Sequence, residues 1–283
     1  MNLSGWIPVS VSDGSVEWRH LPDQRFTHSF FEDTIRLCPK APACRTTMEE
    51  AIEWASTHPG LEPAGFIFHM SRCGSTLVSQ MLAAVQENRV LAEPVPVDDV
   101  IRLGDRVALR AMIGALAQPA PGETRLFIKF DCWHIHSYEL IRRAWPATPA
   151  IFLFRNPLEV LVSQLRNPGI WTVADAVIPR AEHVAGLLAA ILRSALNHTG
   201  TLQLVEYTEL PEVVYELFGM SWSKAQRERM QHATRFDAKT PQFEFVADSA
   251  SKRDSAGKDA RAAAEVLLPL YEQLRAKSGA LRD

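Results

Sequence analysis

The apolar residues of this chain form short runs that alternate with longer helical repeats. Five runs have the length and the aromatic or β-branched content of buried strands: 66–68, 90–94, 126–130, 150–154 and 201–207. After several of these runs, apolar positions recur every three or four residues, which indicates helices packed on a sheet. Strands that alternate with helices predict an α/β fold with a parallel central sheet that is covered by helices on both faces.

Residues 1–60 differ from this pattern and form a predicted N-terminal extension. Apolar and polar residues alternate over 6–20 on either side of Asp13-Gly14, which predicts a β-hairpin, and a helix follows it. The remainder, 61–283, is predicted to be one compact P-loop-type domain.

A glycine loop links the first strand of the main domain to a helix. It contains Arg72, Gly74, Ser75 and Thr76, and apolar residues with helical spacing follow from Leu77. Unpaired N–H groups in the first helical turn and the helix dipole favour an anion at such a position. Glycine allows close approach of the backbone, and the two hydroxyl groups add donors. The stretch therefore predicts a phosphate-binding loop.

A second stretch has the features of another anion site. Arg155 follows the apolar run 150–154, Asn156 is a predicted helix cap, and Pro157 suits the first helical position. Ser163 comes two helical turns later, about 12 Å along the axis. A guanidinium fork and a hydroxyl group in this arrangement can bind one phosphate from two sides.

Polar side chains stand at or just after the ends of the predicted strands, namely Arg72, Glu93, Asp131, Arg155 and Tyr207. In parallel α/β sheets, ligands bind outside the carboxyl ends of the strands. We therefore expect these side chains to lie at one site.

Composition narrows the function classes. The net charge of −3 over 283 residues gives no reason to expect the basic face that nucleic acid requires. No stretch approaches the roughly 18 apolar residues of a membrane span, and the N-terminus lacks the regions of a signal peptide. The four cysteines have neither metal-ligand spacing nor disulfide density. We expect a cytoplasmic protein without nucleic-acid or membrane partners.

The two anion motifs, in this order, resemble those of the sulfotransferases that use 3′-phosphoadenosine 5′-phosphosulfate (PAPS), over residues 64–255. In that family, a basic residue, a small polar residue, glycine and two hydroxyl residues bind the 5′-phosphosulfate. Residues 72–76 match, except that Cys73 replaces the usual serine. Arg155 and Ser163 match the 3′-phosphate motif. Cys73 is either a small replacement or an oxidation-sensitive thiol.

The resemblance implies further contacts with the donor. Tyr207 is similar to the strand-end tyrosine that faces the adenine in this family. Lys252 and Arg253 resemble the late basic loop that closes over the 3′-phosphate, although the family's glycine is missing.

The resemblance also implies a reaction, the transfer of a sulfuryl group from PAPS to a hydroxyl or amine acceptor. The product is 3′,5′-ADP, and no metal is required. Arg72 is expected to stabilise the leaving phosphate. The acceptor must lose a proton, so a general base is expected. Glu93 has the position of the glutamate base of protein-tyrosine sulfotransferases and is favoured, and Asp131 is the alternative. Further candidates are His134 and His136.

Two other functions stay open. Asp131 after an apolar strand could hold magnesium in a P-loop kinase or nucleotide hydrolase, although Ser75 stands where such enzymes have lysine. The N-terminal extension favours a non-catalytic nucleotide-binding module, and its hairpin is expected across an edge of the main sheet or over the acceptor site. The sequence identifies neither the acceptor nor the oligomeric state.

Overall fold

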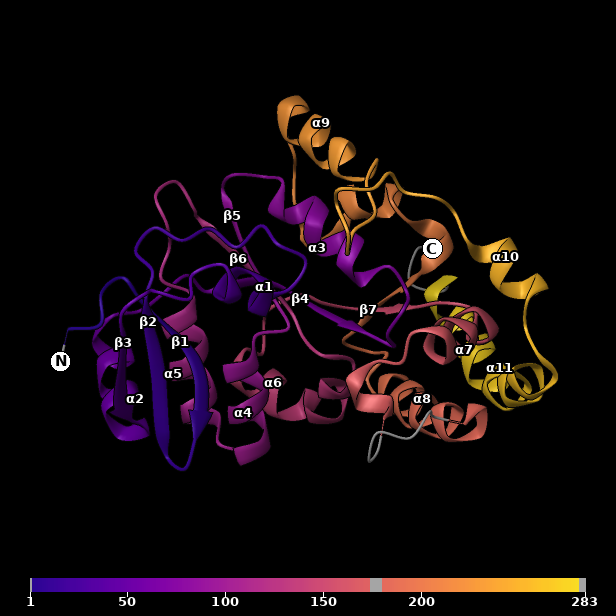
Figure 1. The fold of residues 1–283 in the computed structure, drawn as a ribbon, viewed down its shortest axis with the longest axis horizontal. Coiled ribbons are helices and arrows are strands. Elements are labelled where there is room, and N and C mark those ends of the chain that lie inside the picture. Colours follow the sequence, from indigo (N-terminus) through magenta and orange to yellow (C-terminus); the bar gives the residue numbers. More distant parts are fainter. Residues whose placement is uncertain (1, 174–179, 280–283) are drawn as a thin grey trace.

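The computed structural model describes residues 2–173 and 180–279, and its centre is a five-stranded parallel sheet (Figure 1). The strands have the order β5-β6-β4-β7-β8. They are β4 (Pro63–His69), β5 (Asn88–Ala92), β6 (Arg125–Lys129), β7 (Ala150–Phe154) and β8 (Gln203–Glu206). All five predicted runs are strands of this sheet, so the predicted α/β class is confirmed.

Helices cover both faces of the sheet, as their amphipathic repeats predict (Figure 1). On one side lie α3 (Ser75–Ala83) and α9 (Lys224–Ala233). The other α-helices of the main domain are α4 (Val95–Leu103), α5 (Arg106–Leu116), α6 (Tyr138–Ala144), α7 (Pro157–Arg166), α8 (Ala181–Leu196), α10 (Ser249–Asp254) and α11 (Lys258–Gly279). Short 3₁₀ helices are η1 (Cys132–Ser137), η2 (Ile170–Thr172), η3 (Tyr207–Glu209), η4 (Glu212–Tyr215) and η5 (Leu217–Gly219). Within the described ranges, no helix combines the length and the apolar character needed to cross a membrane.

The N-terminal extension has its own antiparallel sheet. The predicted hairpin is confirmed as β1 (Trp6–Ser12) and β2 (Ser15–His20), and β3 (Ala43–Thr47) pairs with the free edge of β2. Two helices complete the extension, α1 (Phe31–Arg36) and α2 (Met48–Thr57).

The hairpin does not pair with an edge of the main sheet, which was one of its two predicted positions. The hairpin forms a sheet separate from the main one, and β1 packs against α4 and α5. The backbone N–H of Val11 donates a hydrogen bond of 2.8 Å to Asp99 on α4. The inner strand of this separate sheet is β2, which pairs with β1 on one side and β3 on the other.

A buried ion pair ties the extension to the main sheet. The side chains of Arg89 and Glu123 are each 1% exposed, and Arg89 Nη1 lies 2.9 Å from Glu123 Oε2. Arg89 also donates hydrogen bonds to the carbonyl oxygens of Leu116 and Gln24, at 2.7 and 3.1 Å. Its guanidinium lies 4.8 Å from the ring centre of Phe26. The buried apolar residues of the extension and of the main domain accordingly form one continuous core.

We expect Arg89→Met to lower the free energy of unfolding by about 3 kcal/mol, because it leaves the buried Glu123 carboxylate with only the longer contact of 3.6 Å to Arg25 as an ion pair. Chemical denaturation measures this loss. The double variant Arg89→Met/Glu123→Gln removes both charges and should recover part of it. If the double variant is as unstable as the single one, lost packing and not the unpaired charge is the cause.

Candidate active site

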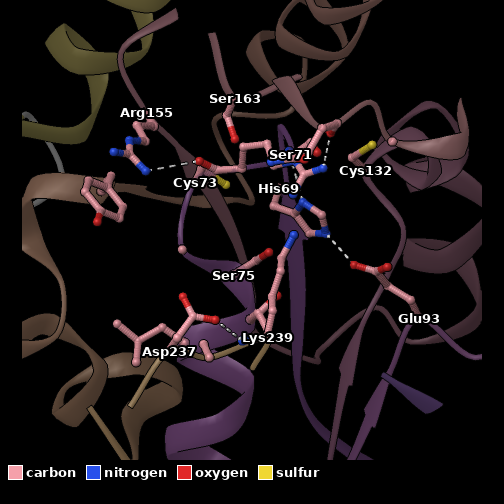
Figure 2. Close-up of a pocket in the computed structure, with 18 of the residues that line it drawn as sticks. His69, Ser71, Cys73, Ser75, Glu93, Cys132, Arg155, Ser163, Asp237 and Lys239 are labelled. Carbon is pink, nitrogen blue, oxygen red and sulfur yellow. Dashed lines mark hydrogen bonds and ion pairs between the residues drawn. The ribbon is translucent and has the colours of Figure 1, made fainter. Parts of the chain in front are cut away.

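A cavity of about 510 Å³ lies at the carboxyl ends of the central strands. Most of the side chains that the sequence analysis selected line it, namely Arg72, Cys73, Gly74, Ser75, Thr76, Glu93, Asp131, Arg155, Ser163, Tyr207 and Lys252. The structure therefore brings together residues that follow each of the five strands and residues of the helices α3, α7 and α10 (Figure 2). Arg253 does not line this cavity, because it turns away and forms an ion pair with Glu159.

The glycine loop has the backbone geometry of an anion-binding turn. Ser71, Arg72 and Gly74 all have positive φ angles, of 74°, 52° and 85°, and α3 begins directly afterwards. Backbone N–H groups of such turns form concave anion sites. Two hydrogen bonds of Ser71 hold the loop: its N–H donates to His69 Nδ1 at 3.0 Å, and its Oγ accepts from Gln164 Nε2 at 2.9 Å. The loop is thus fixed in a conformation that suits a phosphate.

Cys73 is buried within this loop. Its thiol donates to the carbonyl oxygen of Leu153 at 3.2 Å, and the side chain is 0% exposed. Burial raises the pKa of this thiol to about 11. A buried, protonated thiol is a poor nucleophile. Burial and the raised pKa favour the interpretation of Cys73 as a small replacement for serine over that of an oxidation-sensitive thiol.

A buried cluster of charges joins the loop to the next strands. Lys129 is 0% exposed, and its ammonium lies 3.0 Å from Glu93 Oε1 and 3.3 Å from Thr76 Oγ1. His69 Nε2 lies 3.3 Å from the same Glu93 oxygen. Because His69 Nδ1 accepts a hydrogen bond from the backbone, the proton of the neutral ring is on Nε2 and faces Glu93. Burial alone would raise the pKa of Glu93, but Lys129 and His69 hold it well below its usual range.

Asp131 lies near this cluster in a contrasting environment. Burial raises its pKa to about 8, and the negative charges of Glu93 and Asp98 add to the effect. The adjacent His134 contacts Asp131 through Nδ1, which accepts from the Asp131 N–H at 3.2 Å and lies 3.8 Å from the Asp131 carboxylate, while Nε2 donates to Asp98 at 2.7 Å. Of these two neighbouring carboxylates, Glu93 is ionised and Asp131 holds its proton up to a higher pH.

The remaining histidine candidates lie outside the cavity. His136 Nδ1 lies 2.7 Å from Ser194 Oγ, and neither His134 nor His136 lines the cavity. Ligand atoms of Asp98, Asp131 and His134 lie within 4.8 Å of one another, a spacing that a metal ion can use. Both ring nitrogens of His134 already form hydrogen bonds, so a metal would have to replace one of them.

Arg155 defines the other end of the cavity. Its guanidinium lies 3.8 Å from the ring centre of Tyr207 and donates to Glu159 at 2.7 Å. A further hydrogen bond of 3.1 Å goes to Asp248, whose second oxygen lies 2.7 Å from the ammonium of Lys252. A carboxylate of the protein therefore lies between two cations that the sequence assigns to a phosphate.

Some residues of the cavity were not selected from the sequence. His69 ends β4 and lines the cavity, whereas Lys129 ends β6 and is buried beside it, in contact with Glu93. A charged or polar residue at the end of an apolar strand could have indicated both. Phe30 from the N-terminal extension and Lys239 after α9 also line the cavity. No local pattern marks these two, because they reach the site through tertiary contacts.

No protein-family model matches the chain, and no curated protein matches it. Solved structures are similar to it at low identity. A sulfotransferase from Mycobacterium tuberculosis is 11% identical, with 65% of this chain and 75% of that chain covered and a TM-score of 0.49. The sulfotransferase domain from the curacin biosynthetic pathway is 14% identical over 74% of this chain and 97% of that chain, with a TM-score of 0.43. A sulfotransferase from Alicyclobacillus acidocaldarius is 14% identical over 78% of this chain and 95% of that chain, with a TM-score of 0.40.

We expect Gly74→Ala to destabilise the protein by more than the backbone strain alone. The left-handed conformation costs a residue with a Cβ about 1–2 kcal/mol. At Gly74 the new Cβ would also lie 2.5 Å from Leu210 Cδ1 and 3.1 Å from the Tyr207 ring. Overpacking of this kind costs about 1–3 kcal/mol more.

Gly14→Ala is the matched control for this measurement by thermal denaturation. Gly14 has a similar φ of 73°, and a Cβ there would meet no atom within 4 Å. Equal losses in the two variants would show that the contact of Gly74 with Leu210 and Tyr207 is unimportant.

Proposed function

We propose that this protein is a sulfotransferase that binds PAPS and transfers its sulfuryl group to a hydroxyl or amine acceptor. One observation carries the proposal: a single cavity has an anion-binding loop at one end and Arg155 with Ser163 and Lys252 at the other. Two separated anion sites suit a nucleotide that has both a 5′-phosphosulfate and a 3′-phosphate. The donor supplies an activated sulfuryl group, and the protein supplies position and charge.

The residues at the two ends have different tasks in this proposal. The loop from Ser71 to Thr76 holds the 5′ end, where the Arg72 guanidinium balances the charge of the leaving phosphate. Arg155 and Ser163 hold the 3′-phosphate, and Tyr207 lies beside the nucleoside. Asp248 now takes up hydrogen bonds of Arg155 and Lys252, so the phosphate has to displace this carboxylate or share its two cations.

The environments of the two carboxylates support Asp131 as the general base, in place of Glu93. A base works best when its pKa lies near the pH of the reaction. Glu93 is ion-paired with the buried Lys129, which keeps its pKa low and makes it a weak proton acceptor. The raised pKa of Asp131 makes it a stronger one. In this proposal, Glu93 positions Lys129 and His69.

The contact of Thr76 favours sulfuryl transfer over the kinase or hydrolase alternative. In P-loop nucleotidases, the hydroxyl at the position of Thr76 binds magnesium. Here Thr76 Oγ1 accepts a hydrogen bond from the Lys129 ammonium, a cation of the protein itself. Ser75 also leaves the loop without the lysine of those enzymes.

We expect the protein to bind 3′,5′-ADP at least about tenfold more tightly than 5′-AMP, because a hydrogen bond between charged groups contributes about 1.5–3 kcal/mol. Isothermal titration calorimetry with both nucleotides measures the difference. Arg155→Ala should remove most of this preference. Asp248→Asn removes the competing carboxylate and should retain or increase the preference for 3′,5′-ADP over 5′-AMP. Equal affinities of the unmodified protein for the two nucleotides would contradict the sulfotransferase proposal.

We expect the rate of PAPS hydrolysis without an acceptor to rise with pH through about 8, because Asp131 must lose its proton before it can accept one. Asp131→Asn should abolish this rise and lower the rate by about 10²–10⁴-fold. Its affinity for 3′,5′-ADP should change little, since a base acts on the acceptor.

Glu93→Gln is the matched variant of the neighbouring carboxylate. It should lower the melting temperature, because Lys129 loses its counterion. It should keep a rise of the rate with pH, moved to lower pH, because the negative charge of Glu93 no longer helps to raise the pKa of Asp131. If Glu93→Gln removes that rise and Asp131→Asn does not, Glu93 is the base.

A further inference from the structure

Lys239 enters the cavity from a rigid turn in the C-terminal part of the chain. The carboxylate of Asp237 accepts hydrogen bonds from the N–H groups of Lys239 and Thr240, at 3.0 and 2.9 Å. From the N-terminal extension, Ser29 Oγ donates to the carbonyl oxygen of Ala238 at 2.6 Å. Figure 2 shows the Lys239 side chain running into the cavity between Ser75 and Glu93. Its position is therefore fixed by two anchors outside the main sheet.

The ammonium of Lys239 differs from the other cations that line the cavity or lie buried beside it. Each of the others has a partner: Arg72 the carbonyl of Asn167, Lys129 the carboxylate of Glu93, Arg155 that of Glu159, and Lys252 that of Asp248. For Lys239, the described part of the chain provides no acceptor of a hydrogen bond and no ion-pair partner. The ring centre of Phe30, 5.9 Å from Nζ, is its aromatic neighbour.

The charges around Lys239 are those of the 5′ end of the site. Burial, together with the positive charges of Arg72 and Lys129, lowers its pKa to about 8, while Glu93 and Asp237 oppose this shift. An anion beside Lys239 and Arg72 would relieve the repulsion between the cations.

We propose that Lys239 is a catalytic residue that contacts the sulfuryl oxygens of the donor during transfer. The inference rests on the proposed function and deepens it, by assigning a role to a residue outside both phosphate motifs. The charge of the sulfuryl oxygens changes as the bond to the phosphate breaks and the bond to the acceptor forms. A fixed ammonium without a counterion can stabilise them without first breaking an ion pair.

A comparison of two ligands isolates this contact. PAPS carries the sulfuryl group, and 3′,5′-ADP is the same nucleotide without it. For Lys239→Gln, we expect the dissociation constant of PAPS to rise about tenfold and that of 3′,5′-ADP to stay within about twofold. The rate of PAPS hydrolysis without an acceptor should fall by about 10²-fold. Lys239→Arg, which keeps the charge, should restore part of the PAPS affinity and part of the hydrolysis rate.

Lys224→Gln is the matched control, because the Lys224 side chain is 93% exposed and lies on α9. It should leave both dissociation constants and the rate unchanged. Equal weakening of PAPS and 3′,5′-ADP in Lys239→Gln would overturn the inference, because Lys239 would then serve the nucleotide phosphates. Unchanged PAPS affinity and rate would also overturn it. If the unmodified protein does not prefer 3′,5′-ADP to 5′-AMP, the proposed function itself fails.

Discussion

The arrangement of the site depends on the neutralisation of one buried charge. Lys129 ends β6 and is fully enclosed, and an ammonium without a partner in such a place would cost several kcal/mol. Glu93 from the end of β5 and Thr76 from α3 provide its partners, and His69 from the end of β4 closes the cluster. Three neighbouring strands and the helix of the anion-binding loop are thereby held at one edge of the sheet.

The same ion pair contributes to the different pKa values of two neighbouring carboxylates, Glu93 and Asp131. Lys129 keeps Glu93 ionised, and the negative charge of Glu93 then helps to raise the pKa of Asp131, in addition to burial. Two acidic side chains with such different pKa values can act as a permanent anion and as a proton acceptor. The buried Lys129 thus lowers the pKa of Glu93 directly, and the ionised Glu93 in turn helps to raise the pKa of Asp131.

At the other end of the cavity, Arg155 joins segments that are far apart in the chain. It stacks on Tyr207 after β8, pairs with Glu159 on α7 and contacts Asp248 next to α10. It also donates a long hydrogen bond of 3.5 Å to the backbone oxygen of Arg72 in the anion-binding loop. Arg155 therefore links the two ends of the cavity through a direct hydrogen bond.

The sequence by itself determined the five strands, the hairpin, the glycine loop and the Arg155 motif, since each depends on residues that are adjacent or a few turns apart. It also placed most of the cavity residues at strand ends, because parallel strands bring their carboxyl ends to one edge. Only the tertiary structure decided which carboxylate is ion-paired, that Arg253 faces Glu159, and that the hairpin packs on α4 and α5. These features, like the entry of Lys239 and Phe30 into the cavity, depend on contacts between distant segments, and burial and neighbouring charge exist only once those segments have packed.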